Sequence, residues 1–229
     1  MRVSLNEIQV MCRKAFEGMG FAAGDCEDAA DLVGWLQLQG LDGIGTLAKA
    51  LDYLQRETAR DFALRYEDRA LLVLDANGQS VLRCAATAVE MALAKALRGG
   101  QAVLRIHHCH NRILLLGLLS RAAETGLEVQ AHWHDARQRH RAAFAAGAAQ
   151  LQLDSAANAN DGFEQSITVL FSRQAAGPRP LASPLPASPQ GFVVDEAVWQ
   201  RLRQLAEQIL VESSEASRRH GAGGGSDAD

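Results

Sequence analysis

The segment that most constrains the fold is a strand–helix–strand pattern between Ala102 and His134. The run 102–106 is short and aliphatic, 111–125 has apolar residues at helical spacing, and 127–134 has the length and composition of a second strand. With links this short, we expect the two strands to be parallel and adjacent in one sheet. The segment therefore predicts an α/β fold.

The first 175 residues predict a helical unit followed by an α/β core that contains this segment. Over 1–60, Ser4 and Glu7 form a capping box, and apolar residues then recur at helical spacing. Over 61–175, two further short strands and a helix precede the strand–helix–strand pattern, and one more strand follows it. We expect a mostly parallel or mixed sheet with flanking helices.

The last quarter of the chain predicts a crossing and a final helix. All five prolines lie within residues 176–192, which reads as a proline-rich linker. Over 193–229, Asp195 caps a long helix and a glycine-rich tail follows. We expect the four segments to form one compact domain.

Composition excludes several classes of protein. Hydrophobic residues make up 48% of the 229 residues, and the longest apolar run, Ile113–Leu119, is too short to cross a bilayer. The formal net charge of −4 argues against a nucleic-acid binder. The four cysteines form no Cys-x-x-Cys pair, and the N-terminus has no signal-peptide pattern. We therefore expect a cytoplasmic protein that contacts neither nucleic acid nor membrane.

Histidines follow both strands of the strand–helix–strand pattern. His108 and His110 follow the first strand, and His132, His134 and Asp135 end the second. Because open α/β sheets bind ligands at the carboxyl edge, we expect these side chains to converge on one small-molecule site. In this interpretation His110 is the acid/base, His108 and His134 orient or titrate with it, and His132 and Asp135 contact the ligand.

Two alternatives to this interpretation stay open. A divalent metal could be held by His107, His132 and His134, since imidazole is a common ligand, although the spacing fits no standard zinc motif. The same histidines could equally be a solvated rim beside Arg139 and Arg141.

The glycine-rich tail is a second candidate for binding an anion. Glycines between 221 and 225 could approach an anion closely, with Ser217 and Arg218 as donors. No strand precedes these glycines and no helix follows them, so the tail is not a phosphate-binding loop. The alternative is an ordinary frayed terminus.

Two stretches resemble the malate/L-lactate dehydrogenase family, which includes ureidoglycolate, diketogulonate and pyrroline-carboxylate reductases. The first, about 7–54, contains Ala29–Val33 and Gly43–Leu47, and the second, about 73–133, contains the helix and the histidine-bearing turn described above. The resemblance implies a fold unrelated to the Rossmann lactate dehydrogenases, and an NAD(P)-dependent oxidoreductase.

This chain departs from that family at its functional segments. The family's Ser-His-Gly motif is replaced by Leu41, Asp42 and Gly43, and the later segments that bind the nucleotide are not found. NAD(P) is therefore not supported by a motif. The opening at 4–8 and the ending after Glu215 also resemble an uncharacterised bacterial family, a domain of unknown function.

The expected function is that of a small-molecule protein of metabolism, handling a small carboxylate or amino-acid-derived ligand at the histidine-rich edge without the usual NAD(P) site. One alternative is a non-catalytic or regulatory subunit that uses a face around Trp199. Another is a metal-dependent hydrolase or lyase. A homo-oligomer is expected in each case.

Overall fold

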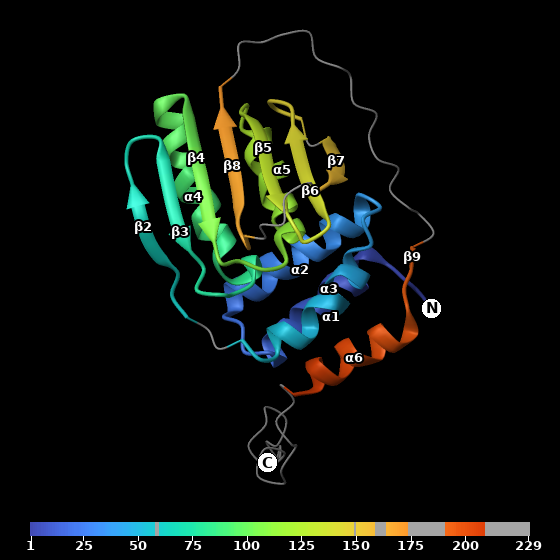
Figure 1. Cartoon of the computed structure of the whole chain (residues 1–229). Helices are drawn as coiled ribbons and strands as arrows, with labels where there is room; N and C mark the ends of the chain where they lie inside the picture. The colour runs from blue at the N-terminus through green and yellow to red at the C-terminus, as the bar shows by residue number, and fades with distance from the viewer. Residues whose placement is uncertain (58–59, 149, 159–163, 174–190, 209–229) are drawn as a thin grey trace, which may run out of the picture.

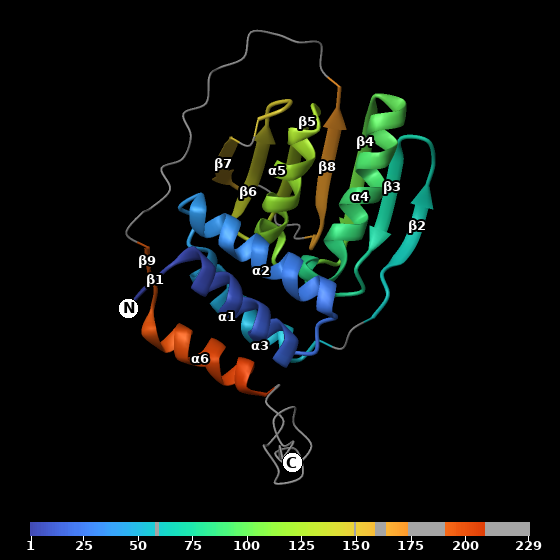
Figure 2. The same ribbon diagram turned by 180° about the vertical axis from the view of Figure 1, so that it is seen from behind.

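The computed structural model describes residues 1–57, 60–148, 150–158, 164–173 and 191–208. These residues form a layer of helices packed against one face of a mixed sheet (Figures 1 and 2). The elements in chain order are β1 (Arg2–Val3), α1 (Leu5–Gly18), α2 (Ala23–Leu38), α3 (Gly43–Leu54), β2 (Ala63–Glu67), β3 (Leu71–Asp75), α4 (Val81–Gly99), β4 (Gln101–His107), the 3₁₀ helix η1 (Arg112–Leu115), α5 (Leu116–Glu124), β5 (Glu128–His134), β6 (Gln138–Phe144), β7 (Leu151–Ala157), β8 (Ile167–Ser172), β9 (Phe192–Val193) and α6 (Glu196–Glu207). The predicted α/β class is confirmed.

The main sheet has the strand order β2-β3-β4-β8-β5-β6-β7. β3 is parallel to β4, whereas β8 is antiparallel to both β4 and β5. β4 and β5 therefore run in the same direction, as expected, but the prediction that they are adjacent is wrong. β8 comes between them because a strand from later in the chain brings its own apolar side chains, Ile167, Val169 and Phe171, into the centre of the sheet.

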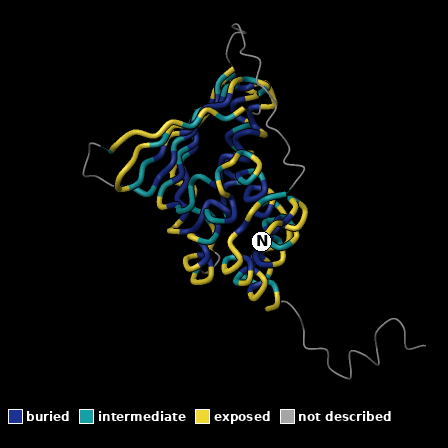
Figure 3. Tube along the Cα trace, turned by 90° about the vertical axis from the view of Figure 1, so that its right-hand side faces the viewer, coloured by how far each residue is buried: buried dark blue, intermediate teal, exposed yellow. Residues whose placement is uncertain are grey.

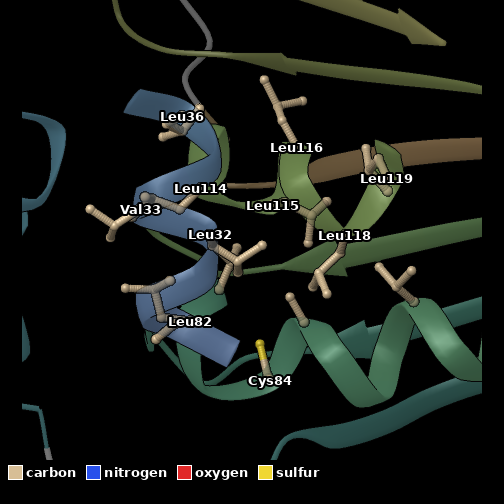
Figure 4. Close-up of a cluster of buried hydrophobic side chains, with 14 of the residues drawn as sticks. Leu32, Val33, Leu36, Leu82, Cys84, Leu114, Leu115, Leu116, Leu118 and Leu119 are labelled. Atoms are coloured by element: carbon tan, nitrogen blue, oxygen red, sulfur yellow. The ribbon is translucent and has the colours of Figure 1, made fainter. Parts of the chain in front are cut away.

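One face of the sheet is covered by α4 and α5, with α2 beneath them (Figures 1 and 2). Alternate residues of the central strands point to this covered face and are buried: Ala102, Leu104, Ile106, Val129, Ala131, Ile167, Val169 and Phe171. Figure 4 shows side chains of α2, α4 and α5 meeting in this layer, and Figure 3 shows the buried residues concentrated where helices meet the sheet.

The other side of the sheet, which we call the open face, carries no helix among the described residues (Figure 1). Its side chains are polar or only partly buried, and Tyr66 and Leu170 are exposed there. The sheet is therefore apolar on one side and mixed on the other.

The first and last described elements pack against each other. β1 pairs antiparallel with β9, and α6 packs against α1 (Figure 2). The approach is close at Gly18, where a Cβ atom would lie 1.9 Å from the carbonyl oxygen of Leu205. The predicted caps at Ser4 and Asp195 are both confirmed. No described helix has the length and apolarity needed to span a bilayer.

Candidate functional site

The structure separates the histidines that the sequence predicts to converge. His110 lines a cavity at the N-terminus of α4, which we call the α4 pocket. His132 and His134 line a different cavity on the open face, over β4, β5, β6 and β8, which we call the open-face pocket. Because β8 lies between β4 and β5, the two strand ends that carry the histidines are two strand spacings apart.

Backbone hydrogen bonds fix His110 against the start of α4. The His110 N–H donates to the carbonyl of Gln79 over 3.0 Å, and the His110 carbonyl accepts from the N–H of Val81 over 3.0 Å. Ser80 caps the helix, accepting from the Leu82 N–H. His110 therefore sits beside the positive end of the α4 dipole, where an anion is stabilised.

The imidazole of His110 is held neutral at neutral pH. Its ring stacks on Tyr53, with 5.9 Å between centroids and 18° between planes. Burial lowers the pKa of His110, the charge of Glu57 opposes this shift, and the charge of Arg112 adds to it. A neutral imidazole can accept a proton from a bound molecule.

The α4 pocket has a volume of about 280 Å³ and combines two arginines with the imidazole. It is lined by Tyr53, Arg56, Glu57, Arg60, Asn77, Gly78, Gln79 and His110. Glu57 accepts a hydrogen bond from the Ser80 N–H and faces Arg83 Nε at 3.5 Å, so its negative charge already has partners. The guanidinium groups of Arg56 and Arg60 give the pocket a positive character.

Sequence reasoning missed Tyr53, Arg56, Arg60 and Gln79. Tyr53 belongs to α3, and the two arginines follow that helix, where basic residues are also expected simply to complement the dipole. Gln79 holds the segment in place, because its side chain both donates to the Arg60 carbonyl and accepts from the Arg60 N–H. Only the tertiary structure brings these residues next to His110.

His108 contacts Asp75 rather than the α4 pocket. Its Nδ1 lies 2.9 Å from Asp75 Oδ1, and its backbone has a φ of 48°. Burial raises the pKa of the Asp75 carboxyl, but hydrogen bonds from Asn77, Arg65 and His108 outweigh burial and hold that pKa at about 2. His108 thus helps to fix the turn after β3, and its predicted role beside His110 stays a prediction.

Asp135 closes the turn between β5 and β6. Its carboxylate accepts from His140 Nε2 at 3.0 Å and from the N–H groups of Arg137 and Gln138. The His140 hydrogen bond is the largest cause that holds the pKa of Asp135 at about 2. These bonds give the carboxylate a structural task in the turn, while its expected ligand contact stays a prediction.

The described residues contain no group of three or more His, Cys, Asp or Glu side chains placed to hold one metal ion. His107 Nδ1 instead lies 2.7 Å from Glu164 Oε1. The metal set of His107, His132 and His134 stays a prediction. Ser217 and Arg218 lie outside the described residues. Burial raises the pKa of the Cys109 thiol to about 12, so it is no nucleophile at neutral pH.

Asp42 and Gly43, at the position of the Ser-His-Gly motif of the family that the sequence resembles, make local structural contacts. The Asp42 carboxylate caps α3 by accepting from the Gly45 N–H at 3.0 Å. Gly43 is packed so tightly that an added Cβ would lie 2.1 Å from the Val33 carbonyl oxygen. This turn serves the packing of α3 against α2.

Comparison with known proteins places the fold. Residues 3–92 match a family model described as "Protein of unknown function (DUF3726)". This match includes the opening segment 4–8 and confirms that the chain resembles an uncharacterised family. No curated protein matches the sequence.

Solved structures of dehydrogenases share the fold at low sequence identity. A dehydrogenase from Sinorhizobium meliloti is 12% identical with a TM-score of 0.70, over 90% of this chain and 99% of that chain. The sulfolactate dehydrogenase of Methanocaldococcus jannaschii is 11% identical with a TM-score of 0.66, over 91% and 97%. The delta1-piperideine-2-carboxylate reductase of Pseudomonas syringae is 20% identical with a TM-score of 0.54, over 69% of this chain and 53% of that chain. The chain thus has a mixed α/β fold similar to that of the malate/lactate dehydrogenase-like proteins.

Proposed function

We propose that this protein binds a small carboxylate in the α4 pocket and that His110 exchanges a proton with it. The observation that carries this proposal is the placement of a neutral imidazole, stacked on Tyr53, in a cavity with Arg56 and Arg60. The N-terminus of α4 adds a further attraction for negative charge.

The dimensions and charge of the pocket favour a small anionic ligand. A volume of about 280 Å³ is at the lower end of ligand cavities, so a bulky ligand is not accommodated. A guanidinium can bind both oxygens of a carboxylate, and this geometry orients the rest of the ligand. Two of the structures with this fold are named for small carboxylates, sulfolactate and delta1-piperideine-2-carboxylate.

In this arrangement each residue has a separate task. Arg56 and Arg60 bind the carboxylate, and Tyr53 covers one side of the imidazole from water. His110 takes a proton from, or returns it to, an acidic group next to the carboxylate. Its backbone bonds to Gln79 and Val81 hold the His110 backbone at a fixed position relative to α4, and the stacking on Tyr53 orients the ring.

The test is an NMR titration of the folded protein with L-malate and with lactate. We expect the ring signals of His110 to shift and the pKa of His110 to rise on binding, because a nearby carboxylate stabilises the imidazolium. The double variant R56Q/R60Q is expected to weaken binding by about tenfold or more. K49Q is the control, because it removes one positive charge from an exposed position on α3.

Three results separate the alternatives. Binding without any effect on the His110 pKa would favour the non-catalytic subunit over the proton-exchanging protein. Equal losses of affinity in K49Q and R56Q/R60Q would show that the two arginines attract the ligand only through the overall charge of the protein. No response of His110 to either carboxylate would remove the proposal. The predicted homo-oligomer stays a prediction that light scattering of the purified protein tests.

A further inference from the structure

The register of the sheet builds a polar row across the open face. Each residue of this row is directly paired with the next across neighbouring strands. In order from β4 to β7, the row consists of Arg105, Thr168, His132, Arg141 and Asp154. Side chains paired in this way point to the same side of a sheet, so Arg105 and His132 flank Thr168 on the open face.

The open-face pocket lies over this row and has a volume of about 250 Å³. It is lined by Arg105, His132, Trp133, His134, Arg139, His140, Glu164, Ser166 and Thr168. Two guanidinium groups, two imidazoles and two hydroxyl groups thus surround one cavity, with a single carboxylate, because the His140 ring stacks on Trp133 on the other side of the sheet. Hydrogen-bond donors come from four different strands or strand ends, so they reach the cavity from several sides.

The two arginines differ in how they are held. Arg105 Nη2 donates to Glu164 Oε2 at 2.8 Å, and the other oxygen of Glu164 lies 2.7 Å from His107 Nδ1. Arg105 Nε is buried without a hydrogen-bond partner among the described residues. The exposed side chain of Arg139 makes no hydrogen bond or ion pair within that same part of the chain. The two arginines therefore have N–H groups that remain available to donate hydrogen bonds to a bound molecule.

The negative charge of Glu164 does not by itself neutralise the positive charge of this cavity. Its one negative charge faces the positive charges of Arg105 and Arg139. The neighbouring Arg141 is partly compensated by Asp154, whose carboxylate lies 3.7 Å away. Burial, and after it the charge of Arg141, lower the pKa of His132, so that ring is a neutral donor at neutral pH.

We propose that the open-face pocket binds a phosphate dianion, either free or as the monoester of a small molecule. A phosphate accepts hydrogen bonds around all of its oxygens, which suits donors arriving from β4, β5, β6 and β8. Its charge of nearly −2 matches the two guanidinium groups. The site is separate from the α4 pocket in both its residues and its ligand class.

The first test is a titration with inorganic phosphate, followed by the histidine ring signals in NMR spectra. We expect the signals of His132 and His134 to shift and those of His110 to stay in place. A parallel titration with glycerol 3-phosphate distinguishes the two sources, since a monoester ligand binds more tightly than inorganic phosphate. Shifts at His110 alone, or no shifts up to millimolar phosphate, would overturn the proposal.

Single variants are expected to change the affinity for phosphate in opposite directions. R139Q is expected to weaken phosphate binding about tenfold, because a charged donor is lost. R141Q is the matched control: it lies on the same strand and face, and makes the same charge change, but does not line the cavity. It should change affinity less than about twofold. E164Q should strengthen binding several-fold, since it removes a repulsive carboxylate and releases Arg105.

Opposite changes of affinity in R139Q and E164Q would exclude a merely structural role for these residues. A variant that only disturbs the sheet would weaken binding in E164Q as well as in R139Q. Equal effects of R139Q and R141Q would show general attraction of anions by a positive surface, and would also overturn the site.

Discussion

The two faces of the main sheet differ in polarity and burial although the same strands build both. On β8, Phe171 is fully buried against the helices, whereas its neighbour Leu170 is 37% exposed on the open face. On β4, Leu104 is buried and Arg105 lines a pocket. Because side chains alternate along a strand, one strand supplies both the apolar core and the polar site.

This difference separates the source of stability from the source of binding. The covered face is packed by α2, α4 and α5 into one hydrophobic layer (Figure 4). Both candidate pockets lie away from that layer, one on the open face and one at the N-terminus of α4. Changes in the pockets should therefore affect binding more than folding, and changes on the covered face should do the reverse.

The largest effect is expected from neighbouring truncations on β8. Phe171→Ala should lower the free energy of unfolding by about 3–5 kcal/mol, because it leaves a cavity in the core. Leu170→Ala should cost under about 1 kcal/mol, since its side chain is partly solvated. Urea denaturation measures both values. Similar losses for the two variants would mean that the open face is covered in solution, and the comparison would fail.

An intermediate effect is expected at Asp75, a buried carboxyl at the end of β3. Asp75→Asn should cost about 1–3 kcal/mol at neutral pH, because charged hydrogen bonds with Arg65 and His108 are lost. The pKa of about 2 is below the value of about 3.9 expected in the unfolded chain. Its stabilisation is therefore complete above pH 4 and is lost as pH falls toward 2.

Acid denaturation of the wild type and the variant checks this window. The difference in stability between them should shrink between pH 4 and pH 2. Asp135→Asn is the comparison, because Asp135 also has a pKa of about 2 but is about half exposed, and it should cost less. A constant difference down to pH 2 would show that Asp75 acts through its shape and not its charge.

The smallest effect on folding is expected at Tyr53, which is 60% exposed. Tyr53→Ala should change stability by no more than about 0.5 kcal/mol. It should nevertheless raise the pKa of His110 toward the usual value, because water then reaches the ring. An NMR pH titration measures this, with Tyr66→Ala on the open face as control. An unchanged pKa would mean that the α4 segment alone buries His110.

Local patterns predicted most of the elements but not all of the sheet. The strand–helix–strand pattern, the capping box at Ser4 and the cap at Asp195 all appear in the structure, because each depends on residues close in sequence. The sequence pattern does not predict β6 or β7. The residues of β6 begin Gln-Arg-His-Arg, a charged run that becomes a strand only by pairing with β5 and β7.

The candidate site divides in the same way. The sequence identified the histidines, since their positions after two strands could be read directly. Their division between two pockets followed from the insertion of β8, a long-range event that no local pattern encodes. Arg56 and Arg60 reach His110 only because α3 ends beside α4, so a search for motifs could not connect them.

The sequence by itself determined the α/β class, the helical start of the chain and the residue types that can carry chemistry, because periodicity and capping act over a few residues. The tertiary structure alone decided which strands are neighbours, which face stays open and which charges share a cavity. Those properties depend on contacts between residues far apart in the chain, and their energies exist only once the layers have packed.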